Sequence, residues 1–231
     1  MTPMNTGMIL DLDETLYPER QFVRSGFRAV AAEVERRFSV PAPAAPGTLL
    51  QTLRAGGRTR ALQVLCLHYD LPPTLVPDLV DVIRTHHPTL RLPDDSATLL
   101  AQAREQGWRL GVLTNGLPEV QARKVQALGL AARVDTVVYA QEWGSGRGKP
   151  ERDAFDVVRA RLGTLPGLTV FVGDDPWYDM VGARAAGQHT ILIRPAGGSP
   201  RASGADRIVT SLDGVLAAAA GLVCRAVANA A

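Results

Sequence analysis

The chain has 231 residues, of which 46% are hydrophobic and 21% are charged, and its formal net charge is +2. Such a composition is typical of a soluble globular protein that is long enough for a sizeable core and a small second domain. The basic residues are scattered and the net charge is small, which argues against a nucleic-acid partner.

The two cysteines, Cys66 and Cys224, lie too far apart to form a metal-binding spacing, so we expect reduced thiols in a cytoplasmic protein. Residues 1–10 lack the basic start of a secretory signal peptide. The apolar segment 215–231 is short and contains Arg225, so we predict no membrane span. This segment could pack on the core or mediate a dimer, which leaves a monomer and a homodimer as open alternatives.

The segment Met8–Leu10 is an apolar run too short for a helix, and Asp11 and Asp13 follow it. The run predicts a buried strand, because strands covered on both faces are continuously apolar. In an extended backbone, positions 11 and 13 point to the same side, where their carboxylates repel each other. A bound cation, or a division of labour between a nucleophile and an acid, would explain the pair. A solvated acidic turn is the simpler alternative.

Residues 17–92 differ from the rest of the chain because they predict helices only. Pro18 suits the first turn of a helix, and apolar residues then recur at helical spacing as far as Phe38. Proline and glycine clusters separate this helix from shorter ones. The predicted helices span residues 19–38, 48–54, 59–68 and 75–85.

From Asp94 onward, predicted helices alternate with predicted strands, which implies a parallel sheet with right-handed crossovers. We therefore predict an α/β fold: a Rossmann-like three-layer core with a central parallel sheet, formed by residues 1–16 and 93–231, plus an inserted all-helical domain at residues 17–92. Helices are predicted at residues 96–106, 118–128, 151–162, 176–186 and from 211 onward, strands at 109–113, 134–139, 168–172 and 190–193, and a loop at 195–205.

Polar side chains follow several of the predicted strands or lie in nearby crossover loops. Ligands of open parallel sheets bind at the carboxyl ends of the strands, so these residues are candidates for one site. The chain has only two lysines among its 25 basic residues, which suggests that each lysine serves where a compact ammonium is needed. The two lysines are Lys124 and Lys149, and the candidate residues are Asp11, Asp13, Thr114, Lys149, Asp174 and Asp175.

Four short motifs contain these residues: Asp11-Leu12-Asp13-Glu14-Thr15, Thr114-Asn115-Gly116, Lys149-Pro150, and Gly173-Asp174-Asp175 with Asp179. In this order they resemble the signature of the haloacid dehalogenase superfamily, and the resemblance covers nearly the whole chain. The helical insert between the first and second motifs resembles the C1 cap of subfamily I.

The resemblance implies a Mg²⁺ cofactor and roles for the acidic residues. Asp11 would be the nucleophile that forms an aspartyl-phosphate. Asp13 would act as general acid for the leaving oxygen and then as general base for the attacking water. The metal ligands would be Asp11, the backbone carbonyl of Asp13, and Asp174, together with water and a phosphate oxygen.

The resemblance also implies phosphate-binding residues. The hydroxyl of Thr114 and the backbone amide of Asn115 would donate hydrogen bonds to the phosphoryl group, and Lys149 would offset its charge. Asp175 has two interpretations: it caps the helix that Pro176 begins, or it contacts the metal directly or through another ligand. Asp179 would face the metal site or Lys149, with a solvated position as the alternative.

The resulting hypothesis is a Mg²⁺-dependent phosphatase for a small phosphorylated metabolite of the nucleotide or sugar phosphate class. A 2-haloacid dehalogenase would need neither Mg²⁺ nor an acid for its halide, so Asp13 and the Asp174-Asp175 pair argue against it. A phosphomutase would need a cap residue that serves the transferred proton, and residues 17–92 identify none. A non-catalytic binding protein on this scaffold would have lost a motif residue, and every core position is present.

Overall fold

The computed structural model describes residues 5–38, 60–194 and 204–230. The chain divides into two compact units. One comprises Met1–Pro18 with Arg91–Ala231, and the other comprises Glu19–Leu90. The first unit contains the sheet and the second is helical.

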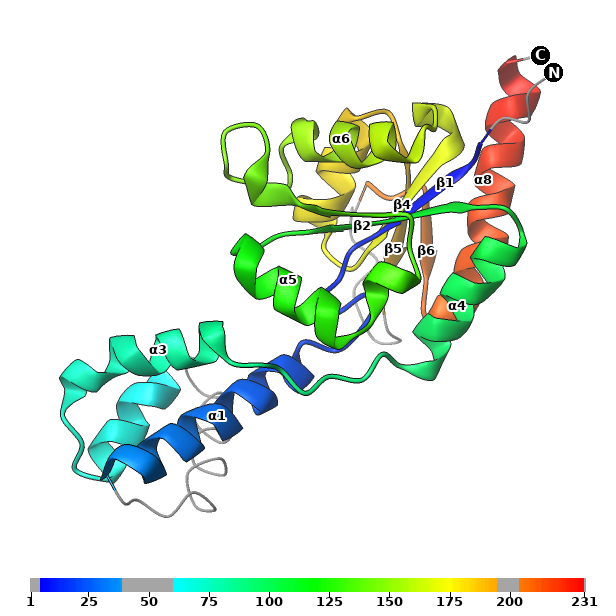
Figure 1. Ribbon diagram of the computed structural model, residues 1–231. Helices are drawn as coiled ribbons and strands as arrows, with labels where there is room; N and C mark the ends of the chain where they lie inside the picture. Colours follow the sequence, from blue (N-terminus) through cyan, green and yellow to red (C-terminus); the bar gives the residue numbers. More distant parts are fainter. Residues whose placement is uncertain (1–4, 39–59, 195–203, 231) are drawn as a thin grey trace. The chain divides into compact units, whose positions relative to one another are not determined.

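The first unit is built on a six-stranded parallel sheet with the order β3-β2-β1-β4-β5-β6. Strand β1 lies at the centre between β2 and β4 (Figure 1). Its residues are buried on both faces, as its continuous apolar run predicts. The strands are β1 (Gly7–Leu10), β2 (Arg109–Thr114), β3 (Thr136–Tyr139), β4 (Thr169–Gly173), β5 (His189–Ile193) and β6 (Arg207–Val209).

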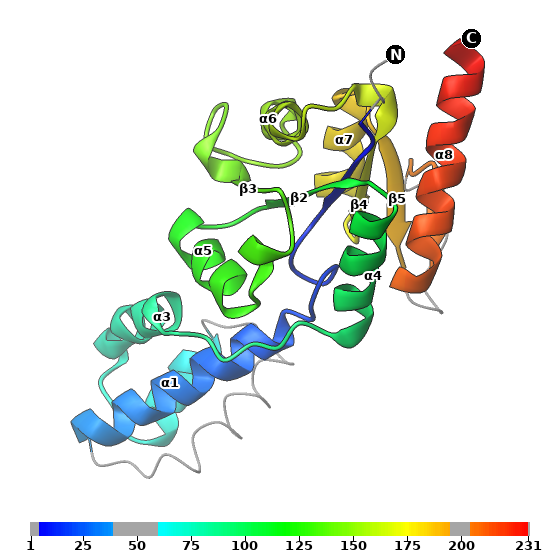
Figure 2. The ribbon, with the colours of Figure 1, turned by 45° about the vertical axis from the view of Figure 1, so that its right-hand side comes forward.

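Helices cover both faces of this sheet and make three layers (Figure 2). On one face α4 (Asp94–Glu105) packs on β2, and α8 (Val215–Ala230) packs on β4 and β5. On the other face α6 (Arg152–Leu162) packs on β1, β2 and β3, and α7 (Gly182–Ala185) packs on β5. Helix α5 (Pro118–Ala127) follows β2 and contacts β3. This arrangement confirms the predicted Rossmann-like α/β class.

The core on the α6 side is filled by aromatic and aliphatic side chains. The rings of Phe155 from α6 and Phe171 from β4 lie with their centroids 5.0 Å apart. Ile9 of β1 belongs to the same buried cluster. The centre of the sheet is therefore fixed by apolar burial, which leaves the polar residues at the strand ends free for other contacts.

Two elements differ from the sequence-based prediction. The helix predicted at residues 176–186 is divided into a π-helical segment, Pro176–Val181, and the short α7. Strand β6 was not predicted, because it offers only two apolar residues and Ile208 is 45% exposed. Backbone pairing with β5 makes it an edge strand. Short 3₁₀ turns occupy Leu130–Ala132, Ala140–Glu142, Pro166–Leu168 and Leu212–Gly214.

The second unit contains α1 (Arg20–Phe38), a helix at residues 60–68 and α3 (Val76–Thr85), which packs on α1. The hydroxyl of Ser25 on α1 accepts a hydrogen bond from the backbone N–H of Thr89 at 2.9 Å. A 3₁₀ turn at Pro73–Leu75 precedes α3. The helix predicted at residues 48–54 lies outside the described residues. Within the part of the chain that the structure describes, none of the helices has the length and apolarity needed to cross a membrane.

Candidate active site

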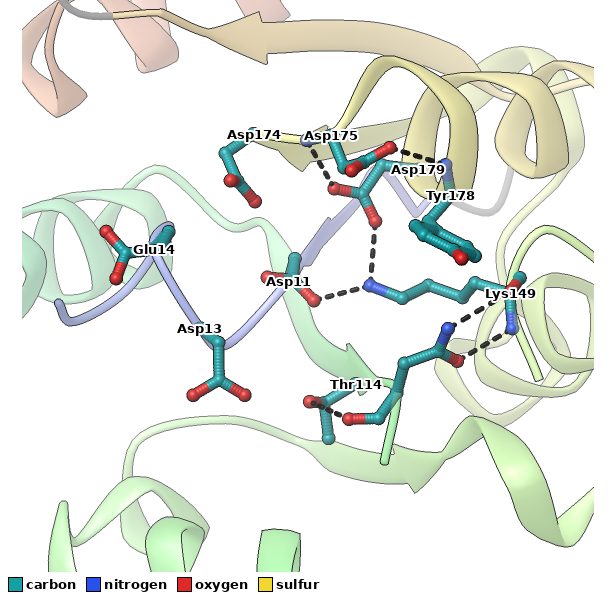
Figure 3. Close-up of a pocket in the computed structure, with 10 residues that line it drawn as sticks. Asp11, Asp13, Glu14, Thr114, Lys149, Asp174, Asp175, Tyr178 and Asp179 are labelled. Atoms are coloured by element: carbon teal, nitrogen blue, oxygen red, sulfur yellow. Dashed lines mark hydrogen bonds and ion pairs between the residues drawn. The ribbon is translucent and has the colours of Figure 1, made fainter. Parts of the chain in front are cut away.

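A cavity of about 250 Å³ opens at the carboxyl ends of the central strands. Because β2, β1 and β4 are parallel neighbours, the residues that follow them meet at one edge of the sheet. All eight residues predicted to form the site line this cavity, and Glu14 and Tyr178 complete its lining (Figure 3). The eight are Asp11, Asp13, Thr114, Asn115, Lys149, Asp174, Asp175 and Asp179.

Lys149 links two buried carboxylates in this cavity (Figure 3). Its ammonium Nζ donates a hydrogen bond to Oδ1 of Asp11 and another, of 2.7 Å, to Oδ1 of Asp179. All three residues are buried. A buried ammonium is costly unless it is paired, and here it has two acceptors.

Burial shifts the pKa values of Asp11 and Asp174. It raises the pKa of the Asp11 carboxyl to about 8, although the ammonium of Lys149 opposes this increase. It also raises the pKa of Asp174 to about 6, and the nearby Asp179 carboxylate adds to the increase. Burial alone would lower the pKa of Lys149, but the carboxylates of Asp11 and Asp179 raise it above its ordinary value.

The same carboxylates fit a divalent cation. One oxygen from each of Asp11, Asp174 and Asp179 lies within 4.8 Å of the others. A bound divalent cation would favour the ionised form of all three carboxyls, whose combined charge the single ammonium of Lys149 does not balance. Hard oxygen ligands and excess negative charge are what Mg²⁺ prefers. The residues present therefore suit this ion.

Asn115 holds the backbone of Lys149 from both sides. Its side-chain Oδ1 accepts a hydrogen bond from the Lys149 backbone N–H at 2.7 Å, and its Nδ2 donates to the Lys149 carbonyl at 3.0 Å. The preceding residue, Gly148, has φ +77°, and a Cβ there would collide with Oδ1 of Asn115. The side chain of Asn115 therefore positions Lys149, while its backbone amide remains the predicted phosphate ligand.

Asp175 caps the π-helical segment that follows β4. Its Oδ1 accepts hydrogen bonds from the backbone N–H groups of Trp177 at 2.7 Å and Tyr178 at 2.8 Å. The Asp175 N–H itself donates to Oδ2 of Asp179 at 3.1 Å. A Cβ at Gly173 would collide with the carboxylate of Asp179, so glycine is required for this approach.

The capping geometry predicts that Asp175→Ala destabilises the protein by about 1 kcal/mol, because two backbone donors lose their acceptor. Urea denaturation of the metal-free protein measures this loss. Asp175→Asn keeps an acceptor oxygen and is the matched control, with an expected loss of less than about 0.5 kcal/mol. Equal losses of stability in the two variants would show that the negative charge of Asp175, and not its capping hydrogen bonds, stabilises the protein.

Asp13 contacts residues that the sequence-based site did not include. Its carboxylate accepts hydrogen bonds from the hydroxyl of Tyr17 at 2.7 Å and from Nε2 of Gln121 at 2.8 Å. The ammonium of Lys124 reaches both carboxylate oxygens, at 2.8 and 2.9 Å. The scarcity of lysine was the one signal in the sequence that pointed to Lys124. Gln121 precedes Lys124 by three residues and so shares its face of α5.

Comparisons with known proteins show what the chain as a whole is similar to. The family model described as a haloacid dehalogenase-like hydrolase matches residues 6–187. The ribulose-1,5-bisphosphate 5-phosphatase of Halopiger xanaduensis is 30% identical, over 90% of this chain and 92% of its own length. The phosphoserine phosphatase of Thermus thermophilus is 28% identical, over 83% and 82%. The crystal structure of a 2-haloacid dehalogenase from Pseudomonas syringae superimposes with a TM-score of 0.63 at 21% identity, over 96% of this chain and 99% of that one, which shows a shared fold.

Proposed function

The chain belongs to the haloacid dehalogenase-like hydrolases, and from this membership we propose that it uses Mg²⁺ and an aspartyl-phosphate on Asp11 to hydrolyse a small phosphorylated metabolite. Its relatives are named phosphatases, and the chain is a phosphoric monoester hydrolase. The observation that carries the proposal is the buried Lys149, which contacts Asp11 and Asp179 in the cavity that Thr114 and Asp174 also line.

The first step transfers the phosphoryl group to the protein. A carboxylate oxygen of Asp11 attacks phosphorus while the bond from phosphorus to the ester oxygen breaks. Asp13 gives its proton to that leaving oxygen, so the product departs as an alcohol. Thr114 and Lys149 bind the non-bridging oxygens and offset their charge.

The second step regenerates Asp11. The Asp13 carboxylate takes a proton from a water molecule as the water oxygen attacks phosphorus. The bond between phosphorus and Asp11 then breaks, and inorganic phosphate is released. Asp13 thus serves first as acid and then as base, and it has regained its proton when the cycle ends.

Asp11, Asp174 and the backbone carbonyl of Asp13 would hold the Mg²⁺ ion. When bound, the ion screens the negative charge that the phosphoryl group and the carboxylates share. Asp179 lies close enough to contribute an oxygen but also accepts from Lys149, so we propose that it orients the lysine.

We assign the helical unit, Glu19–Leu90, the role of a cap. A cap that closes over a site excludes bulk water and limits access to small molecules. Nucleotides and sugar phosphates are small enough to satisfy this limit on substrate size. A screen of phosphorylated metabolites in the presence of Mg²⁺ is the direct way to identify the substrate.

A metal-removal assay tests the reaction type. We expect Mg²⁺-dependent release of p-nitrophenol from p-nitrophenyl phosphate, a loss of about 100-fold or more in excess chelator, and recovery when Mg²⁺ is restored. Chloroacetate serves as the control substrate, and we expect no chloride release from it. Full activity in chelator, or turnover of chloroacetate, would favour a dehalogenase instead.

A further inference from the structure

We propose that Lys124 and Gln121 are positioning residues for Asp13. They hold its carboxylate at the edge of the cavity and offset the charge that it carries after its proton has moved to the leaving oxygen. This inference rests on the proposed function, because it presupposes that Asp13 is the acid and base of the phosphatase reaction.

The two residues form a buried polar pair on α5. Gln121 is 2% exposed and Lys124 is 4% exposed, although both side chains are polar. Burying an ammonium costs free energy that only a well-placed anion recovers. Asp13 is that anion, and Lys124 contacts both of its oxygens, at 2.8 and 2.9 Å. Helix α5 therefore directs a buried positive charge toward the carboxylate of Asp13.

The two lysines of the chain serve different aspartates. Lys149 contacts Asp11, whereas Lys124 contacts Asp13. Figure 3 shows the carboxylate of Asp13 pointing away from the pair formed by Asp11 and Lys149. Because each aspartate has its own ammonium partner, the two carboxylates lie in distinct electrostatic environments.

Gln121 connects Asp13 to the phosphate-binding segment. Its Nε2 lies 2.8 Å from Oδ2 of Asp13, 2.5 Å from Oγ1 of Thr114 and 2.7 Å from the carbonyl oxygen of Asn115. An amide carries two hydrogens, so it serves two of these acceptors at a time. A change at Gln121 should therefore alter the position of Asp13 relative to Thr114.

The chemistry predicts which leaving groups depend on Lys124 and Gln121. When Asp13 gives up its proton, it becomes a carboxylate, and the adjacent ammonium of Lys124 stabilises the new charge. A poor leaving group needs that proton in the transition state. The anion p-nitrophenolate is stabilised by its nitro group and departs without a proton. The contribution of Lys124 and Gln121 should therefore grow as the leaving group becomes poorer.

The test compares phenyl phosphate with p-nitrophenyl phosphate, two esters of similar shape that differ in leaving group. We expect Lys124→Met and Gln121→Met to lower kcat/KM about tenfold more on phenyl phosphate than on p-nitrophenyl phosphate. Gln126→Met, at an exposed position of the same helix, is the control and should leave both values unchanged. In an Asp13→Asn background, neither substitution should further change the ratio of kcat/KM on p-nitrophenyl phosphate to kcat/KM on phenyl phosphate, since both act through Asp13.

Equal losses of kcat/KM on the two esters would overturn the inference and assign Lys124 and Gln121 a structural role. The same conclusion would follow if either substitution caused its full loss of kcat/KM again in the Asp13→Asn background. Thermal unfolding identifies a variant that fails to fold. Gln121→Met leaves no buried charge unpaired and carries the test if Lys124→Met is unfolded. If the wild type does not hydrolyse p-nitrophenyl phosphate, or if Asp11→Asn does, the proposed function itself fails, and the positioning role of Lys124 and Gln121 falls with it.

Discussion

Asp11→Asn is expected to lower phosphatase activity by roughly three orders of magnitude or more, because an amide oxygen cannot form the aspartyl-phosphate. Release of p-nitrophenol in the presence of Mg²⁺ measures the loss. Incubation with p-nitrophenyl phosphate followed by mass spectrometry gives a second readout, in which only the wild type should gain the mass of a phosphoryl group. Retained turnover in Asp11→Asn would refute the assignment of the nucleophile.

The same substitution should preserve the fold. A carboxyl group whose pKa is higher in the folded protein than in the unfolded chain destabilises the fold at any pH above its unfolded value. Burial raises the pKa of Asp11 from 3.8 to about 8, so at neutral pH the metal-free chain must take up a proton at this carboxyl on folding, which costs stability. Asn has no ionisable group to bury and can still accept a hydrogen bond from Lys149. We therefore expect the Tm of metal-free Asp11→Asn to equal or exceed that of the wild type.

Lys149→Met is expected to cause a comparable loss of activity and also to destabilise the protein. The substitution leaves the buried carboxylates of Asp11 and Asp179 without their shared ammonium. Removing one partner of a buried ion pair costs about 3–5 kcal/mol. Urea denaturation of the metal-free protein would measure this change, and steady-state assays would measure the activity.

A double variant separates the two effects of Lys149. Lys149→Met combined with Asp179→Asn removes one of the stranded charges, so it should recover part of the lost stability. It should not recover activity, because no ammonium is left to bind the phosphoryl group. A Lys149→Met protein that is as stable and as active as the wild type would contradict the central place given to this ion pair.

The strand-end residues were predictable because their position depends on features that the sequence displays directly. Apolar runs such as Met8–Leu10 mark buried strands, and the alternation of strands with helices makes the sheet parallel. In a parallel sheet the carboxyl ends of all strands lie at the same edge. The convergence of Asp11, Thr114 and Asp174 in one cavity follows from this direction together with the strand order β2-β1-β4, which the structure shows and the sequence did not predict.

The partners of those residues were not predictable, because they depend on how a helix is rotated and on how loops approach each other. Helical spacing places Gln121 and Lys124 on one face, but it does not tell which residues that face meets. The side chain of Asn115 holds the backbone of Lys149, a residue 34 positions away, and no local pattern encodes that contact. In the sequence, Asp175 is compatible with both a cap and a metal contact. The folded chain shows that its carboxylate accepts hydrogen bonds from the backbone N–H groups of Trp177 and Tyr178.

The central place of β1 in the sheet has a consequence for biosynthesis. The ribosome makes β1 early, but its neighbours in the sheet are residues 109–114 and 169–173. Neither edge of β1 can therefore form its backbone hydrogen bonds until segments synthesised much later are available. Pairings between segments so distant along the chain form slowly and leave apolar strands exposed in the meantime. A nascent chain that ends before residue 169 has no Asp174 to complete its acidic cluster, so ion capture should await nearly complete translation.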